Sequence, residues 1–156
     1  MIFGKERALK KEIIKIGRKL YDLRLVVARA GNLSARLDAD NILVTKSGTS
    51  LGSLILNDVI RVDLGNIENK PVTSEFPLHS LVYKNFPNKV IIHCHPTLVN
   101  AYFALYSDLK ALTFETKLYL GNIPVVTQDT PAITKPELVV DALKINNLVV
   151  IKNHGV

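Results

Sequence analysis

The fold is organised around Val90-Ile91-Ile92-His93-Cys94-His95-Pro96, an apolar run that ends in two histidines with one residue between them. Alternate side chains of a β-strand share a face, so His93 and His95 should point the same way, and the proline should end the strand. Two imidazoles held side by side can bind one metal ion. His154 follows a second apolar run, residues 148–151, which also has the pattern of a buried strand. The sequence therefore predicts two strands whose ends bring three histidines toward one metal ion.

The composition is that of one globular domain spanning residues 1–156, with 47% apolar and 22% charged residues. The apolar runs are far shorter than the roughly 18–20 residues that span a bilayer, so we expect no membrane partner. The N-terminus lacks a secretory apolar segment, and the single cysteine, Cys94, suits a reducing compartment; both features predict a cytoplasmic protein. Cys94 should point away from the neighbouring histidines, as a small buried residue rather than a metal ligand.

The net charge of +6 raises the question of nucleic-acid binding. The basic residues are densest in a predicted helix over residues 4–27, where they alternate with apolar residues at helical spacing. This is the pattern of a solvated helix face opposite a core stripe, and no nucleic-acid recognition motif accompanies it. We therefore expect no nucleic-acid partner, whereas a positive field would favour a phosphorylated small substrate.

The predicted elements alternate in a way that indicates a layered α/β domain. Neighbouring strands dominate the first half, and helices alternate with strands in the second half, which predicts a mixed sheet with helices on its faces. One helix should begin near Glu75, with Ser74 as its N-cap. Short strands are predicted within residues 30–36 and 56–64, and further strands cover 42–45, 89–93, 123–127 and 148–151. The later helices cover 75–86, 97–106, part of 108–121 and 137–144.

Three loops are rich in small residues that can donate hydrogen bonds, and they contain Asn32, Ser47 with Gly48, and Thr73 with Ser74. Short hydroxyls, amides and exposed backbone N–H groups suit a phosphate, especially beside a helix N-terminus. Each loop taken alone also fits a simple turn with a cap. Similarly, Glu75 fits a fourth metal ligand, a proton carrier or an ordinary first-turn glutamate, and His79 fits a structural histidine.

Five motifs follow one another along the chain: Gly31-Asn32-Leu33-Ser34, Thr45-Lys46-Ser47-Gly48, Thr73-Ser74-Glu75 with His79, His93-Cys94-His95 and Asn153-His154-Gly155. In this order they resemble the class II aldolase/adducin family, which includes fuculose-phosphate aldolase. The resemblance implies a three-layer α/β/α sandwich with a mixed, largely antiparallel central sheet, and a homotetramer with active sites between subunits.

The resemblance also implies roles for these residues. His93, His95 and His154 would bind Zn2+, and Glu75 would alternate between metal ligand and acid/base. The phosphate of a sugar-phosphate substrate would lie among five residues: Asn32, Ser47, Gly48, Thr73 and Ser74.

The leading functional hypothesis is a zinc-dependent aldolase that cleaves a phosphorylated ketose, similar to fuculose 1-phosphate, into dihydroxyacetone phosphate and an aldehyde. The alternatives are a pentulose-phosphate 4-epimerase, which typically has aspartate where Glu75 stands, a sugar-phosphate dehydratase, and a non-catalytic adducin-like assembly module. The sequence departs from the family pattern twice. Lys46 stands where proline is common, and the chain stops at Val156, so we expect it to lack the family's C-terminal segment.

Overall fold

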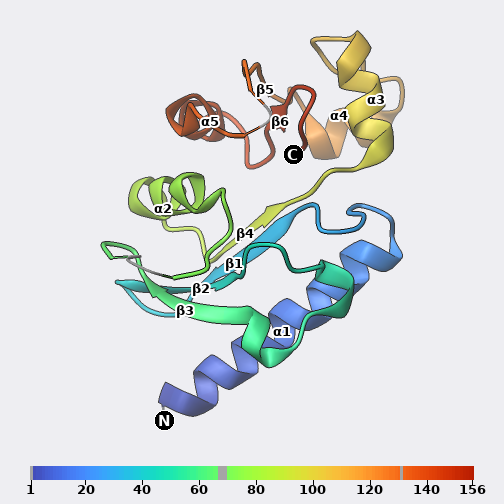
Figure 1. Cartoon of the computed structure of the whole chain (residues 1–156). Coiled ribbons are helices and arrows are strands. Elements are labelled where there is room, and N and C mark those ends of the chain that lie inside the picture. The colour runs from blue at the N-terminus through green and yellow to red at the C-terminus, as the bar shows by residue number, and fades with distance from the viewer. Residues whose placement is uncertain (1, 67–69, 131) are drawn as a thin grey trace.

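A computed structural model describes residues 2–66, 70–130 and 132–156. Four strands form an antiparallel sheet in the order β3-β2-β1-β4 (Figure 1). In this sheet Asn32 pairs with His93, which places the first predicted phosphate loop beside the histidine strand. The strands are β1 (Asn32–Arg36), β2 (Asn41–Thr45), β3 (Val59–Asp63) and β4 (Val90–His93).

Helices cover both faces of this sheet. On one face α1 (Ile2–Asp22) buries Ile13 against Leu33 and Leu43 of the sheet. On the other face α2 (Phe76–Asn85) buries Phe76 and Tyr83 against the opposite side chains of β2 and β3. Short 3-10 turns at Leu51–Ser53 and Leu56–Asp58 connect β2 to β3 beside α1.

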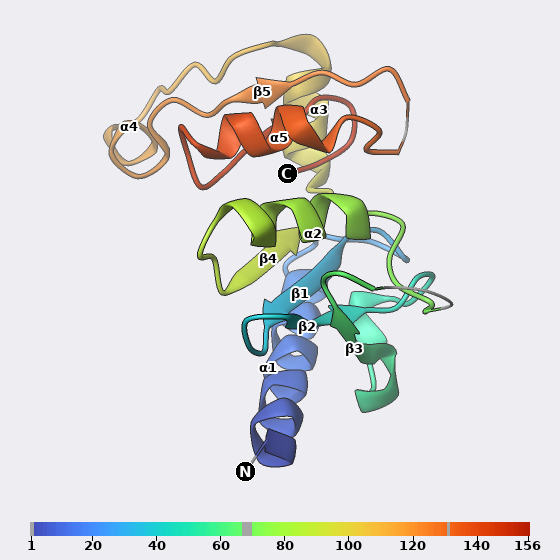
Figure 2. The same ribbon diagram turned by 90° about the vertical axis from the view of Figure 1, so that its left-hand side faces the viewer.

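The C-terminal part packs on the far side of α2 (Figure 2). Here β5 and β6 form a separate parallel pair, and α5 buries Val139 and Val140 against Leu78 and Val82 of α2. The elements are α3 (Thr97–Leu105), α4 (Phe114–Leu120), β5 (Val125–Val126), α5 (Pro136–Leu143) and β6 (Val150–Ile151). The predicted α/β fold class is confirmed, and its mixed strands are divided between an antiparallel sheet and a parallel pair.

Two local predictions were wrong. The first helix ends at Asp22 rather than Val27, because the chain reverses at Arg24, which has a φ of 57°. Ser74 is not the N-cap of α2: Glu75 takes that position, and the backbone oxygen of Thr73 accepts a hydrogen bond from the Phe76 N–H at 3.1 Å. The last strand ends at Ile151 as predicted, although it begins only at Val150, and His154 lies in the turn after it.

Among the residues that the structure describes, every helix is too short or too polar to span a lipid bilayer.

Candidate metal centre

The histidine strand places two of the four clustered side chains. β4 ends at His93, and His95 follows two residues later with its Nε2 atom 2.8 Å from Nε2 of His93. His154 approaches from the C-terminal layer, where its ring stacks on that of His93 with centroids 5.0 Å apart. A tight turn after β6 presents it: the His154 N–H donates to the backbone oxygen of Ile151, and Asn153 has a left-handed φ of 62°.

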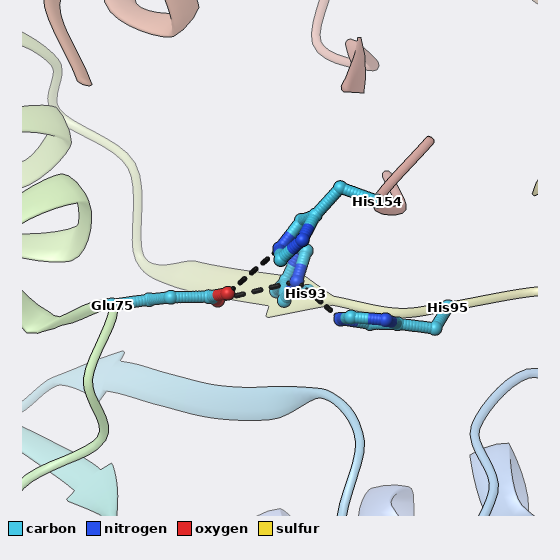
Figure 3. Close-up of side chains that lie close together, drawn as sticks. All are labelled: Glu75, His93, His95 and His154. Carbon is cyan, nitrogen blue, oxygen red and sulfur yellow. Dashed lines mark hydrogen bonds and ion pairs between the residues drawn. The ribbon is translucent and has the colours of Figure 1, made fainter. Parts of the chain in front are cut away.

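Glu75 completes the cluster from the start of α2 (Figure 3). Its Oε1 atom lies 2.8 Å from Nε2 of His154, and its Oε2 atom lies 3.2 Å from Nε2 of His93. The side-chain amide of Asn32 donates a third contact to Oε2 at 2.7 Å. The ligand atoms of Glu75 and the three histidines all lie within 4.8 Å of one another, so one ion can reach all four.

The protonation states of the cluster suit a cation. His93 Nδ1 lies 2.9 Å from the backbone oxygen of Val156, which can only accept, so Nδ1 carries a hydrogen and Nε2 is the atom that faces the cluster. Burial is the main cause that lowers the pKa of His95 to about 4, which favours the neutral form of that ring. Neutral imidazoles are the metal-binding form of histidine.

The carboxyl of Glu75 is ionised in this environment. Burial alone would raise its pKa, but the imidazoles of His154 and His93 outweigh burial and hold the pKa of Glu75 well below its usual range. The imidazole nitrogens that contact this carboxylate share protons with it, and a bound cation would take the place of those protons. The donor set of three imidazoles and one carboxylate fits a divalent ion such as zinc.

The predicted phosphate loops converge beside this cluster. One cavity of about 200 Å³ is lined by both groups of residues. The backbone joins the second loop to the third, because Ser47 N–H donates to the Pro71 oxygen at 3.0 Å, and it joins the first loop to the histidine strand through the pairing of Asn32 with His93. The predicted residues that line the cavity are Asn32, Ser47, Gly48, Thr73, Ser74, Glu75 and His95.

Gly31 allows the first loop to approach the histidine strand. It has a φ of +79°, and a Cβ atom there would lie 2.7 Å from the backbone oxygen of His93. A side chain at this position would therefore push the loop away from β4. A larger cavity of about 520 Å³ lies along β4 between α2 and α5, but its lining is mainly apolar and lacks the phosphate loops.

His79 and Cys94 take the structural positions that the sequence predicted. His79 is fully buried, with Nδ1 2.6 Å from the hydroxyl of Ser34, and burial lowers its pKa to about 4. That hydroxyl also lies 2.9 Å from the Tyr83 hydroxyl, so α2 is tied to β1 through side chains. Cys94 is buried, and burial raises the pKa of its thiol to about 11.

Sequence reasoning missed three participants. The backbone oxygen of Val156 orients His93, and no residue-type pattern could reveal a backbone contact. Arg29 and Lys46 line the cavity with the phosphate loops. Their positive charges were visible in the sequence, but their shared location depends on the fold.

The comparisons with known proteins agree with this arrangement. The model of the "Class II Aldolase and Adducin N-terminal domain" matches residues 11–156. L-fuculose phosphate aldolase from Methanocaldococcus jannaschii is 35% identical over 150 residues, covering 94% of this chain and 81% of the relative. 3-oxo-tetronate 4-phosphate decarboxylase from Haemophilus influenzae is 32% identical over 160 residues, covering 96% and 75%. The crystal structure of L-fuculose-1-phosphate aldolase from Thermus thermophilus is similar with a TM-score of 0.85 and 27% identity, covering 96% and 78%.

Proposed function

Since the chain belongs to the class II aldolase and adducin family, whose aldolases are metal-dependent lyases, we propose that it is a zinc-dependent aldolase acting on a phosphorylated ketose. The observation that carries this proposal is the convergence of three imidazoles and one carboxylate next to the cavity of the small-residue loops. We assign residues 1–156 as a whole to one such domain.

In this proposal His93, His95 and His154 hold the zinc ion, with Glu75 beside it. Such a metal, when bound, supplies a Lewis acid that polarises the substrate carbonyl. The contact between His93 Nδ1 and the Val156 oxygen fixes the ring so that Nε2 faces the ion.

Glu75 would move the proton at the reacting carbon. When a ketose 1-phosphate is cleaved, the bond between C3 and C4 breaks, the C4 hydroxyl loses its proton, and C3 gains one. Glu75 lines the cavity with an ionised carboxylate, so it can take up a proton and deliver it to a substrate bound there. Asn32 orients this carboxylate through its 2.7 Å hydrogen bond.

The substrate phosphate would occupy the end of the cavity formed by Asn32, Ser47, Gly48, Thr73 and Ser74. Gly48 has a φ of +73°, a conformation that turns backbone N–H groups in a way common in anion-binding loops. The start of α2 lies beside Thr73 and Ser74, and its dipole favours an anion. The phosphate and the reacting carbon would then be held at opposite ends of one pocket.

A second candidate is decarboxylation of a phosphorylated 3-oxo acid, because the Haemophilus influenzae relative carries that name at 32% identity. Both reactions break a carbon–carbon bond on the carbon next to a carbonyl group, so the same metal cluster would serve either. Measuring the products of zinc-loaded protein with fuculose 1-phosphate and with a 3-oxo-tetronate 4-phosphate would separate them.

Release of dihydroxyacetone phosphate, detected by coupled NADH oxidation, supports the aldolase. If carbon dioxide is released from the 3-oxo-tetronate 4-phosphate and the ketose is not cleaved, the protein is a decarboxylase and not an aldolase. Dephosphorylated ketoses should be much poorer substrates, and equal turnover of both forms would refute the phosphate assignment. Interconversion of two pentulose phosphates without release would favour an epimerase.

We also propose that the chain assembles as a homotetramer. Large apolar side chains are exposed over residues 98–120, and such patches mark association surfaces. They include Leu98, Leu105, Leu112, Phe114, Leu118 and Tyr119.

The single buried cysteine fits a reducing compartment such as the cytoplasm.

A further inference from the structure

Two cations in the proposed phosphate pocket have no assigned role. Arg29 and Lys46 both line the cavity that Ser47, Gly48 and Thr73 also line. Within the described residues, neither side chain makes a hydrogen bond or an ion pair. Arg29 is exposed and Lys46 is half-buried, so both side chains are free to turn toward an anion bound in the cavity that they line.

The only acid that lines this cavity, among the residues that the structure describes, is Glu75. Its carboxylate already contacts His154, His93 and Asn32, which leaves no oxygen free of a partner. Glu75 therefore does not neutralise Arg29 or Lys46. The loop end of the cavity keeps two uncompensated positive charges.

The backbone holds Arg29 in a strained turn next to the pocket. Ala28 has a φ of 50°, in the left-handed region where a residue with a side chain costs roughly 1–2 kcal/mol. A hydrogen bond of 2.9 Å from Ala30 N–H to the Val27 oxygen closes the turn, and Gly31 follows with a φ of +79°. Strained backbone of this kind clusters at ligand-binding sites.

Lys46 is presented by the strand before it. Val44 packs on the α2 side of the sheet, and side chains two residues apart share a face, so Lys46 also lies on the side of α2. Its N–H donates to the Asp58 oxygen at 2.8 Å, and it forms a β-bridge with Val72, directly before Thr73. The Lys46 backbone is thus held on both sides.

We infer that Arg29 and Lys46 are specificity-determining residues that pair with a doubly ionised phosphate monoester in this cavity. The inference rests on the proposed function and deepens it. Two cations match the charge of about −1.5 to −2 that a phosphate monoester carries near neutral pH, whereas a carboxylate supplies only one charge. Arg29 offers a planar fork that can bind two phosphate oxygens, and Lys46 adds a point charge.

Calorimetric titration of zinc-loaded protein with inorganic phosphate tests this inference. Each of Arg29→Met and Lys46→Met should weaken phosphate binding about tenfold, the loss expected for one charge-assisted contact. The charge-conserving variants Arg29→Lys and Lys46→Arg should retain most of the affinity, which a merely structural role would not predict. Lys11→Met, on the exposed face of α1, serves as the matched control and should bind phosphate like the wild type.

The outcomes separate this inference from the proposed function. If the wild type binds phosphate and both methionine variants bind equally well, the two cations are not phosphate partners, although the phosphate pocket stands. If the wild type binds no phosphate, the pocket itself is wrong and the inference falls with it. The wild type also gives a test without mutation: binding through two cations must weaken as chloride raises the ionic strength, and salt-independent binding would overturn the inference.

Discussion

The carboxylate of Glu75 lies 2.8 Å from the imidazole of His154, although 79 positions separate the two residues in the chain. Glu75 stands at the start of α2, and His154 lies in the turn after β6. Their contact therefore depends on how the C-terminal layer packs on α2, where α5 buries Val139 and Val140. The cluster contains residues from both halves of the molecule. Substitutions that disturb the packing of the C-terminal layer on α2 should therefore alter metal binding.

Glu75→Gln should lower turnover by roughly two to four orders of magnitude, the range for a lost acid/base group. The amide is nearly isosteric with the carboxylate but cannot carry the proton. The three histidines remain, so zinc content measured by mass spectrometry should change little. Glu137→Gln, an exposed glutamate in the first turn of α5, is the matched control and should leave turnover unchanged. Unchanged activity in Glu75→Gln would return Glu75 to the role of an ordinary first-turn residue.

Gly155→Ala should weaken zinc binding and lower stability together. A Cβ atom there would collide with the backbone oxygen of Cys94 and would lie 3.1 Å from Cε1 of His93. The turn that presents His154 would have to shift, and overpacking of this kind costs about 1–3 kcal/mol. Urea unfolding and a zinc-competition titration measure the two effects. Gly4→Ala is the control, since a Cβ atom at Gly4 meets no other atom within 4 Å; equal behaviour of the two variants would contradict the account.

His79 should make the metal-free protein less stable as the pH falls from 7 to 5. Burial lowers its pKa from 6.5 to about 4 in the folded protein, so the unfolded chain takes up a proton in this window while the folded protein does not. The free energy of unfolding therefore decreases as the pH is lowered, and this group accounts for a loss of roughly 2 kcal/mol at pH 5. Urea unfolding at both pH values should show a smaller loss for His79→Gln. A loss of equal size in the variant would assign the effect to other groups, such as His95.

Much of the site could be predicted because each motif stands at the end of a regular element. The apolar run before His93 predicted β4, and the short polar residues Asn32 and Thr73 marked loops beside strands and a helix. The order of the motifs then resembled one family, whose fold class is confirmed. What the residues alone left open was whether these loops converge, and the structure brings them to one cavity.

The errors arose where long-range contacts decide the backbone. The first helix carries apolar residues up to Val27, but Arg24 takes a left-handed conformation without the glycine that usually signals a helix end. Ser74 has the side chain of a good N-cap, yet the chain turns one residue later at Glu75. The contact of Val156 with His93 involves a backbone oxygen, which leaves no mark on residue type.

Phe114→Lys combined with Leu118→Lys should break the proposed tetramer. Both side chains are exposed on α4, at 87% and 76% of their full surface, and burying them between subunits would explain their position. Light scattering during gel filtration should show four chains for the wild type and a smaller species for the variant. Lys110→Gln, an exposed residue just before α4, is a control that should not change the mass. A wild type that stays monomeric across micromolar concentrations would contradict the assembly.

X-ray absorption spectroscopy of the zinc-loaded protein tests the central claim that one metal ion binds among Glu75, His93, His95 and His154. The account predicts one zinc ion per chain, with scattering from three imidazole nitrogens at about 2.0–2.1 Å and at least one oxygen ligand. His154→Ala should remove one imidazole from the spectrum and leave the other two. His154 lies in the turn after β6, whereas His93 and His95 lie at the end of β4, so the substitution should not displace them. A zinc ion surrounded by oxygen alone, or a spectrum that the His154→Ala variant leaves unchanged, would contradict the account.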